Sequence, residues 1–143
     1  MIRMVDSIKN KKILIVDDET DMIIFVSTVV ETIGFKPIAA HSGTDALKKS
    51  QSEIPDLIVL DVMMPKIEDG IQTYFYFRSN IKLSSIPIVI LSAIAEKTFM
   101  HLIRVLSAQE GKHIPVPQAY MEKPPDATKL STLIKSILSN NTF

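Results

Sequence analysis

Charged and polar side chains directly follow four of the short apolar segments in this sequence. In an open parallel sheet the carboxyl ends of the strands lie along one edge, and ligands bind at that edge. If the apolar segments are strands of such a sheet, several carboxylates, one hydroxyl and one ammonium lie close together. They are Asp17, Asp18 and Glu19 after the first segment, Asp61 after the third, Ser92 and Ala93 after the fourth, and Glu122, Lys123 and Pro124 after the fifth.

A group of carboxylates at one edge predicts a metal site. Clustered carboxylates repel one another and stay ionised only when a cation lies among them. Oxygen ligands, the absence of cysteine and the lack of suitably spaced histidines favour Mg²⁺, or Mn²⁺, over zinc. Such a site suits phosphoryl transfer, because the metal and a lysine neutralise phosphoryl oxygens while a carboxylate attacks in line. A carboxylate nucleophile would form an aspartyl phosphate.

The elements that must position these residues alternate along the chain. Short segments rich in Ile, Val and Leu are separated by segments with apolar residues at helical spacing. This alternation predicts an α/β fold, a five-stranded parallel sheet with helices on both faces. The expected strands are Ile13–Val16, Pro37–Ala40, Leu57–Leu60, Ile86–Leu91 and Pro117–Met121.

Five helices are expected between and after the strands. The first ends at Gly34, the second is capped by Ser42, and the third is expected to follow Gly70. The fourth carries Phe99, Leu102, Ile103 and Leu106, and the last has an apolar stripe from Leu130 to Leu138. In the third, residues 74–77 are four successive aromatics, which cannot all face the core. One or two of them should therefore be exposed.

Length and composition are those of one globular domain. The chain has 143 residues, no cysteine and a formal net charge of zero, which gives no support for nucleic acid or an anionic membrane as a partner. Its apolar runs are far below the roughly 20 residues that span a bilayer. We expect a cytoplasmic protein with a leader over residues 1–11, one domain over residues 12–143 and no output domain in this chain.

Four motifs, each after an expected strand, make a family resemblance specific. They are Ile13-Leu14-Ile15-Val16-Asp17-Asp18-Glu19, Leu60-Asp61-Val62-Met63-Met64-Pro65, Leu91-Ser92-Ala93 and Tyr120-Met121-Glu122-Lys123-Pro124. In this order they resemble the receiver (CheY-like) domain of bacterial two-component response regulators. The resemblance extends from about Lys12 to about Asn140 and implies the flavodoxin-like (βα)5 fold.

The resemblance implies a role for each matching residue. Asp61 corresponds to the phosphoacceptor, Asp18 to the direct acidic ligand of the metal, and Asp17 to its neighbour, which often acts through water. The backbone carbonyl of Met63 would be a further metal ligand, as would the carboxylate of Asp61. The metal expected is Mg²⁺, with Mn²⁺ as an alternative.

Three more residues correspond to the groups that sense the phosphoryl group. Lys123 corresponds to the lysine that contacts phosphoryl oxygens, and a cis bond before Pro124 is common in the family. Ser92 corresponds to the hydroxyl that hydrogen-bonds the phosphoryl group. Tyr120 corresponds to the aromatic switch residue, which turns inward when that hydroxyl moves. The expected output surface comprises the fourth helix, the fifth strand and the fifth helix.

The resemblance implies a signalling domain and not an enzyme with a metabolite substrate. The expected phosphodonor is a histidine kinase or a histidine phosphotransfer protein, and the expected reader is a downstream protein target or a fused output domain. A homodimer is also considered, whereas direct contact with nucleic acid or a membrane is not expected. Magnesium-dependent self-phosphorylation and slow self-dephosphorylation are the only reactions expected.

Two alternatives are kept. One is an interaction or dimerisation module on the same fold that does not depend on phosphorylation. The other is a dehalogenase-like hydrolase with an aspartyl-phosphate intermediate. That class has a second acid two residues after its nucleophile, where this sequence has Met63.

The sequence departs from the family pattern in three places. The family's glycine eight residues past the phosphoacceptor is Asp69 here, and Gly70 follows. The span from Ser92 to Lys123 is longer than usual, and we place the excess at Gln109–Val116 as a partner-specific loop or an extension of the fourth helix. Met63 and Ile94 are both apolar at positions that influence phosphate hydrolysis in the family, which predicts a long-lived phosphoryl state.

Overall fold

A computed structural model gives the fold for residues 10–142, with side chains described as far as Ser139. It contains one sheet of five parallel strands, as the alternation of segments predicted, and the strand order is β2-β1-β3-β4-β5. Most of the expected leader, residues 1–9, lies outside the described residues. The strands are β1 (Lys12–Val16), β2 (Lys36–Ala40), β3 (Leu57–Leu60), β4 (Ile88–Ser92) and β5 (Ala119–Glu122).

Strand boundaries agree best where both faces of the strand are buried. β3 has the predicted limits, and all of its residues are buried. β4 begins two residues later than predicted, after Pro87, which has no N–H for the ladder but whose carbonyl accepts from Ile58 N at 3.0 Å. β4 and β5 each end one residue later than predicted, so Ser92 and Glu122 are the last residues of their strands.

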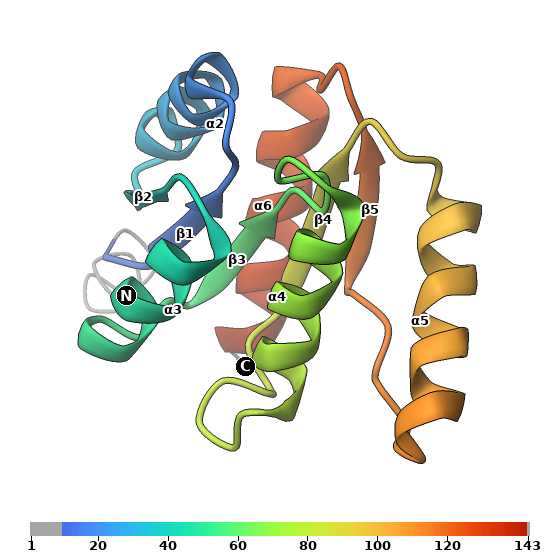
Figure 1. The fold of residues 1–143 in the computed structure, drawn as a ribbon. Helices are drawn as coiled ribbons and strands as arrows, with labels where there is room; N and C mark the ends of the chain where they lie inside the picture. Colours follow the sequence, from blue (N-terminus) through green and yellow to red (C-terminus); the bar gives the residue numbers. More distant parts are fainter. Residues whose placement is uncertain (1–9, 143) are drawn as a thin grey trace.

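Helices cover both faces of the sheet (Figure 1). One face carries a core cluster with residues from α3, α4 and α5, and the other carries a cluster with residues from α2 and α6. Alternate strand residues supply the two clusters: Leu14 and Val16 join the first, Ile13 and Ile15 the second. The helices are α2 (Thr20–Thr32), α3 (Gly43–Ser52), α4 (Ile67–Ser79), α5 (Glu96–Glu110) and α6 (Ala127–Thr142).

The start of α4 differs from the prediction. Gly70 does not precede the helix but lies in its first turn, because α4 begins at Ile67. A Cβ on Gly70 would lie 2.1 Å from the Cα and the carbonyl oxygen of Val62. The glycine is therefore needed for close packing of α4 on the loop after β3, and reading it as a helix boundary was wrong.

The aromatic run of α4 is largely accommodated in the core. Tyr74 and Phe77 are completely buried, and Phe75 and Tyr76 are half-buried against the same cluster. The predicted long connection after α5 is shorter than expected, because Gln109 and Glu110 belong to the helix, which ends at Gly111 in the left-handed conformation (φ 64°). Within residues 10–142, none of the helices has the length and apolar character required to cross a bilayer.

Candidate functional site

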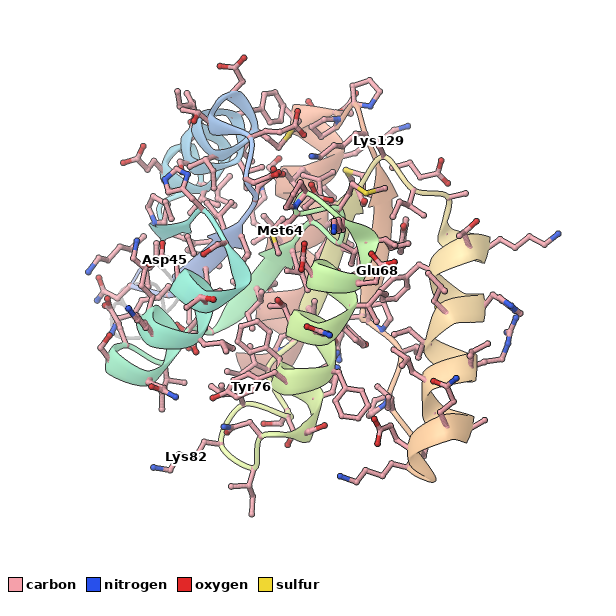
Figure 2. All side chains as sticks on the ribbon, viewed as in Figure 1. Asp45, Met64, Glu68, Tyr76, Lys82 and Lys129 are labelled. Carbon is pink, nitrogen blue, oxygen red and sulfur yellow. The ribbon has the colours of Figure 1, made fainter. Side chains whose placement is uncertain are left out.

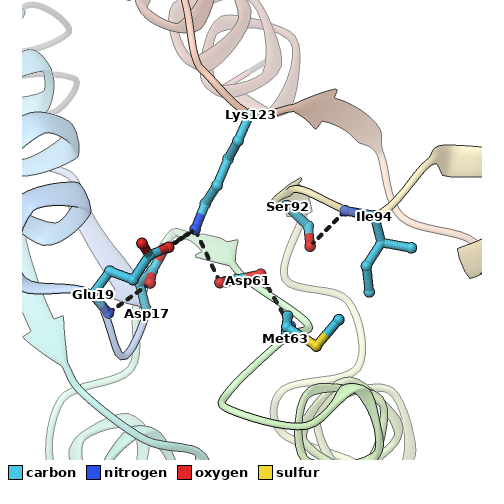
Figure 3. A network of polar contacts seen from close by, with 7 residues as sticks. All are labelled: Asp17, Glu19, Asp61, Met63, Ser92, Ile94 and Lys123. Carbon is cyan, nitrogen blue, oxygen red and sulfur yellow. Dashed lines mark hydrogen bonds and ion pairs between the residues drawn. The ribbon is translucent and has the colours of Figure 1, made fainter.

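Backbone hydrogen bonds at the carboxyl ends of the strands position three of the predicted residues. Asp17 N donates to Ala40 O at 3.1 Å, Asp61 N to Val16 O at 2.9 Å, and Lys123 N to Ser92 O at 2.8 Å. Each bond extends the ladder by one residue past a strand end. The side chains that follow β1, β3 and β5 are thus held at the same edge of the sheet (Figure 3).

The ammonium of Lys123 lies among three carboxylates. Its Nζ is 3.0 Å from Asp17 Oδ2, 3.0 Å from Asp61 Oδ2 and 2.7 Å from Glu19 Oε1. The Asp17 and Asp61 side chains are 3% and 2% exposed, and that of Lys123 is 11% exposed. One positive charge thus faces three negative ones, two of which belong to buried carboxylates. The site therefore keeps a net negative charge, which favours the binding of a further cation.

The pKa values of two of these groups are displaced in accordance with this arrangement. Burial lowers the pKa of Lys123, but hydrogen bonds to Glu19, Asp17 and Asp61 outweigh it and the net shift is upward. Burial raises the pKa of Asp17, and the charge of Asp61 adds to this. The Glu19 N–H and Lys123 act in the opposite direction but do not cancel the effect. Lys123 is therefore firmly cationic, and ionised Asp17 is held at a cost.

Carboxylate oxygens of Asp17, Glu19 and Asp61 lie within 4.8 Å of one another. Hard oxygen donors at this spacing fit the ligand preference of Mg²⁺ or Mn²⁺, so the donor set agrees with the cation expected from the sequence. Asp18, expected to be a direct ligand, is exposed and is not part of this group. Glu19 was not among the expected ligands. A local turn positions Glu19 here, because its backbone N–H donates to Asp17 Oδ1 at 2.9 Å.

Both oxygens of Asp61 have defined partners. Oδ1 accepts a hydrogen bond from Met63 N at 3.0 Å, and Oδ2 faces Lys123. The carboxylate is therefore fixed from two sides, by its own loop and by the loop after β5 (Figure 3). The Met63 side chain is 40% exposed and takes no part in this bond.

Ser92 and Tyr120 lie beside the acidic group and share a neighbour. Ser92 is completely buried, and its Oγ accepts from Ile94 N at 3.4 Å. The half-buried Tyr120 donates its hydroxyl to Ile94 O at 2.6 Å and packs on Phe99. Burial raises the pKa of Tyr120 to about 12, with further contributions from Glu122, Glu96 and Asp61. The Lys123–Pro124 peptide is cis, as the resemblance implied.

A separate hollow lies away from this site. It has a volume of about 640 Å³ between α2 and α6, and its lining includes Ile24, Phe25 and Val29 but none of the carboxylates that contact Lys123. It is mainly apolar, so its position does not alter the assignment of the polar site at the strand ends.

A parallel sheet of order 2-1-3-4-5 with an acid cluster and a lysine at its carboxyl edge defines a phosphoacceptor signalling domain of the CheY-like class. Residues 13–135 match the response regulator receiver domain family. The chain belongs to this family, and its function is that of a receiver domain in two-component signalling.

Relatives and solved structures agree with this membership. The chain is 40% identical over 129 residues to the alkaline phosphatase synthesis transcriptional regulatory protein PhoP of Bacillus subtilis, covering 90% of this chain and 49% of PhoP. It is 36% identical over 131 residues to a probable transcriptional regulator, ycf27, of Cyanophora paradoxa, covering 92% and 49% of the two chains. The chain thus spans about half the length of the curated relatives it matches.

Two solved receiver structures show the same fold. One is a CheY-like receiver domain protein from Methanospirillum hungatei, with a TM-score of 0.73 and 23% identity over 92% of this chain and 95% of that one. The other is the chemotaxis protein CheY4 of Vibrio cholerae, with a TM-score of 0.72 and 25% identity over 89% and 98% of the two chains.

Proposed function

We propose that Asp61 is the phosphoacceptor of this receiver domain and takes its phosphoryl group from a phosphohistidine of a histidine kinase or a phosphotransfer protein. The observation that carries the proposal is the contact of Lys123 Nζ with the buried Asp61 carboxylate, at 3.0 Å. A nucleophilic carboxylate with an ammonium beside it has, already in place, a group that neutralises the charge of an incoming phosphoryl oxygen.

In the proposed step, an oxygen of Asp61 attacks the phosphorus of the phosphohistidine. The new O–P bond forms as the N–P bond breaks, and the imidazole nitrogen keeps the electron pair of that bond. Lys123 exchanges one of its carboxylate contacts for a phosphoryl oxygen, and Ser92 donates its hydroxyl hydrogen to another. The product is an aspartyl phosphate at residue 61.

A divalent cation completes the site. We assign Asp17 and Asp61 as ligands, because the sequence suggests both and their carboxylates belong to one acidic group. Glu19 joins them on the structure's geometry, and Asp18 and the Met63 carbonyl are added from the family resemblance. When bound, Mg²⁺ would neutralise charge on the phosphoryl oxygens. The carboxylates would hold the cation, and the ammonium of Lys123 would neutralise an oxygen of the transferred group.

The signal passes from Asp61 to the surface through Ser92 and Tyr120. A dianionic group at Asp61 attracts the Ser92 hydroxyl, whose oxygen accepts a long hydrogen bond from Ile94 N. Ile94 also binds the Tyr120 hydroxyl through its carbonyl, so a movement of this residue alters both contacts. Phosphorylation would thereby shift an equilibrium between two forms of the α5-β5-α6 surface, which a downstream protein or a fused output domain reads.

Incubation with acetyl phosphate and magnesium tests the phosphoacceptor. We expect mass spectrometry to show the addition of one phosphoryl group, which Asp61→Asn abolishes. Asp21→Asn, a change of an exposed carboxylate on α2, serves as the matched control and should retain the addition. Phosphoryl uptake by the Asp61→Asn variant at the wild-type level would refute the assignment, and no uptake by any variant would favour the phosphorylation-independent module.

A further inference from the structure

The guanidinium of Arg78, on α4, is buried beneath the connection between α5 and β5. Arg78 is only 7% exposed, and its five N–H groups all donate hydrogen bonds to oxygens. The acceptors are Tyr74 Oη at 3.2 Å, Ser84 O at 3.1 Å, Ile86 O at 2.8 Å, Val116 O at 3.4 Å and Gln118 Oε1 at 2.7 Å.

This buried charge is neutralised by dipoles. Within the described part of the chain, Arg78 has no ion pair with a carboxylate, so the carbonyl and amide oxygens must compensate its charge. Gln118 Oε1 also accepts from Ile88 N at 2.7 Å, which joins the connection to the start of β4. Removal of any of these contacts leaves buried polar groups unpaired, and the arrangement therefore fixes the chain around Val116 and Gln118 firmly on α4.

Tyr74 extends this arrangement toward the switch. Its hydroxyl donates to Pro115 O at 2.5 Å and accepts from Arg78. The Tyr74 ring contacts the Phe99 ring edge-on, with ring centroids 5.3 Å apart. The Phe99 ring also contacts the Tyr120 ring, with centroids 5.5 Å apart. Contacts thus run from the connection through the rings of Tyr74 and Phe99 to Tyr120, whose hydroxyl donates to Ile94 O.

The attachment of α5 explains why these contacts matter. Phe99 and Ile103 are the fully buried residues of this 15-residue helix, which stands at the edge of the molecule beyond β5 (Figure 1). Because α5 has only two buried side chains, its position on the domain also depends on the contacts of the segment that follows it. Residues 111–118 provide this support through Ile114, which is 4% exposed, and through the oxygens bound by Tyr74 and Arg78.

We propose that Tyr74 and Arg78 are positioning residues for Tyr120. They lock the connection at residues 111–118 onto α4 and, through Phe99, hold the Tyr120 ring in its half-buried position. Release of the connection and outward movement of Tyr120 are then one coupled event. The inference rests on the proposed function in one respect, that the half-buried position of Tyr120 goes with phosphorylation at Asp61.

Two consequences follow from reciprocal coupling. Phosphorylation that favours the half-buried ring should tighten the connection on α4, and a partner that pulls the connection away should disfavour the phosphorylated form. The departure of this sequence from the usual family spacing, which lies at this connection, would therefore serve regulation of the site and not only contact with a partner.

Tyr74→Phe is the sharpest test, because it keeps the ring on Phe99 and removes the hydroxyl. Tyr76→Phe is the matched control: Tyr76 lies on the same helix, but its hydroxyl contacts Gln51 and Asn80 on the side of α4 toward α3 (Figure 2). The chain has three tyrosines, so 3-fluorotyrosine labelling gives three ¹⁹F resonances, and Tyr120→Phe identifies that of Tyr120.

In the phosphate-free protein, we expect Tyr74→Phe to move the Tyr120 resonance toward that of solvent-exposed fluorotyrosine. Hydrogen exchange of the Ile114 and Gln118 amides, which bond Ser107 Oγ and Ile88 O, should accelerate about threefold to tenfold, the effect of one lost hydrogen bond. Tyr76→Phe should change neither. An unchanged Tyr120 resonance together with unchanged exchange in Tyr74→Phe would overturn the proposal.

Beryllofluoride with Mg²⁺, a stable mimic of the phosphoryl group, tests the coupling to the site. Tyr74→Phe should weaken its binding about threefold to tenfold, again the effect of one hydrogen bond, whereas Tyr76→Phe should stay within about twofold of the wild type. Equal affinity in Tyr74→Phe and the wild type would refute the coupling. Failure of the wild-type protein to bind beryllofluoride would instead count against Asp61 as the phosphoacceptor. The Tyr120 resonance in phosphate-free Tyr74→Phe would still decide whether Tyr74 positions Tyr120.

Discussion

The ammonium of Lys123 lies 2.7 Å from the carboxylate of Glu19, closer than its 3.0 Å contacts with Asp17 and Asp61. Glu19 is also the exposed member of the group, with 62% of its side chain accessible, whereas the two aspartates are buried. An exposed ion pair of this kind contributes only about 0.2–1 kcal/mol. Glu19 is therefore the partner that Lys123 can most easily exchange for a phosphoryl oxygen.

Glu19→Gln should accelerate phosphorylation from acetyl phosphate at saturating magnesium. The substitution removes one competitor for Lys123, and an ion pair of up to about 1 kcal/mol corresponds to an acceleration of at most about fivefold. Initial rates of phosphoprotein formation measure the effect. Glu31→Gln, at an exposed position of α2, is the control and should leave the rate unchanged. A slower rate for Glu19→Gln would show that Glu19 supports the cation more than it competes for the lysine.

Asp17 gives the metal-free protein a pH dependence of definite sign. Burial raises its pKa above the value of 3.8 that it has in the unfolded chain. Between these two pKa values the folded state binds more protons than the unfolded state, so the free energy of unfolding falls as the pH rises. Asp17→Asn removes this titration. The stability of the variant relative to the wild type should therefore increase from about pH 3.8 upward and level off once Asp17 is ionised.

Urea unfolding of both proteins across this pH range, without divalent metal, measures the difference. Lys123 titrates far above this range, because its own pKa is raised above 10.5, so its contribution stays constant there. Asp21→Asn is the control and should show no such gain. Magnesium should reverse the ranking near neutral pH, since it stabilises a site that retains the Asp17 carboxylate. A stability difference that shrinks as the pH rises would contradict the prediction.

Apolar side chains at residues 63 and 94 are expected to prolong the phosphorylated state. Met63 and Ile94 lie on the side of Asp61 away from Glu19 (Figure 3), and neither can orient an attacking water. The double substitution Met63→Asn with Ile94→Gln should make loss of the phosphoryl group several times faster, because polar groups there can bind water. The pair Met63→Leu with Ile94→Val keeps the apolar character and should leave the lifetime unchanged. Decay of radiolabelled phosphoprotein measures both, and wild-type decay within seconds would contradict the hypothesis.

The prediction from sequence was strongest for residues whose position depends on topology alone. Asp17 and Asp61 each follow a buried strand, and Lys123 follows the half-buried edge strand β5. Parallel pairing of β1 with β3, β3 with β4 and β4 with β5 must bring the carboxyl ends of these strands to one edge. The contact of Glu19 with Lys123 could not be obtained in this way. It depends on a local turn in which Glu19 N bonds Asp17 Oδ1, and three successive acids offer several such turns.

Contacts distant in sequence were also beyond reach. Arg78 and Gln118 are 40 residues apart, and the periodicity of neither segment predicts the hydrogen bond between the buried guanidinium and the amide oxygen. Ile71, Tyr74 and Arg78 are spaced so that they share one face of α4, and all three are buried. Helical spacing thus places a residue on a face, whereas the partner of a charged residue on that face depends on how two other segments pack.

The misread glycine of α4 yields the last prediction. In a helix, Gly→Ala should stabilise by about 1 kcal/mol on propensity alone. At Gly70 the added Cβ would lie 2.1 Å from backbone atoms of Val62, which cannot rotate away. We therefore expect Gly70→Ala to lower the free energy of unfolding by about 1–3 kcal/mol, as overpacking does, and to slow phosphorylation because Val62 follows Asp61.

Gly111→Ala is the matched comparison for Gly70→Ala. A Cβ there would meet no atom within 4 Å, but the backbone has a φ of 64° and strain of about 1–2 kcal/mol is expected for a residue with a side chain. Both variants should lose stability in urea unfolding, and only Gly70→Ala should also lose phosphorylation rate, since its clash lies next to Asp61. Wild-type stability in Gly70→Ala would mean that α4 can move away from the β3 loop without cost, and the close packing would then not explain why residue 70 is glycine.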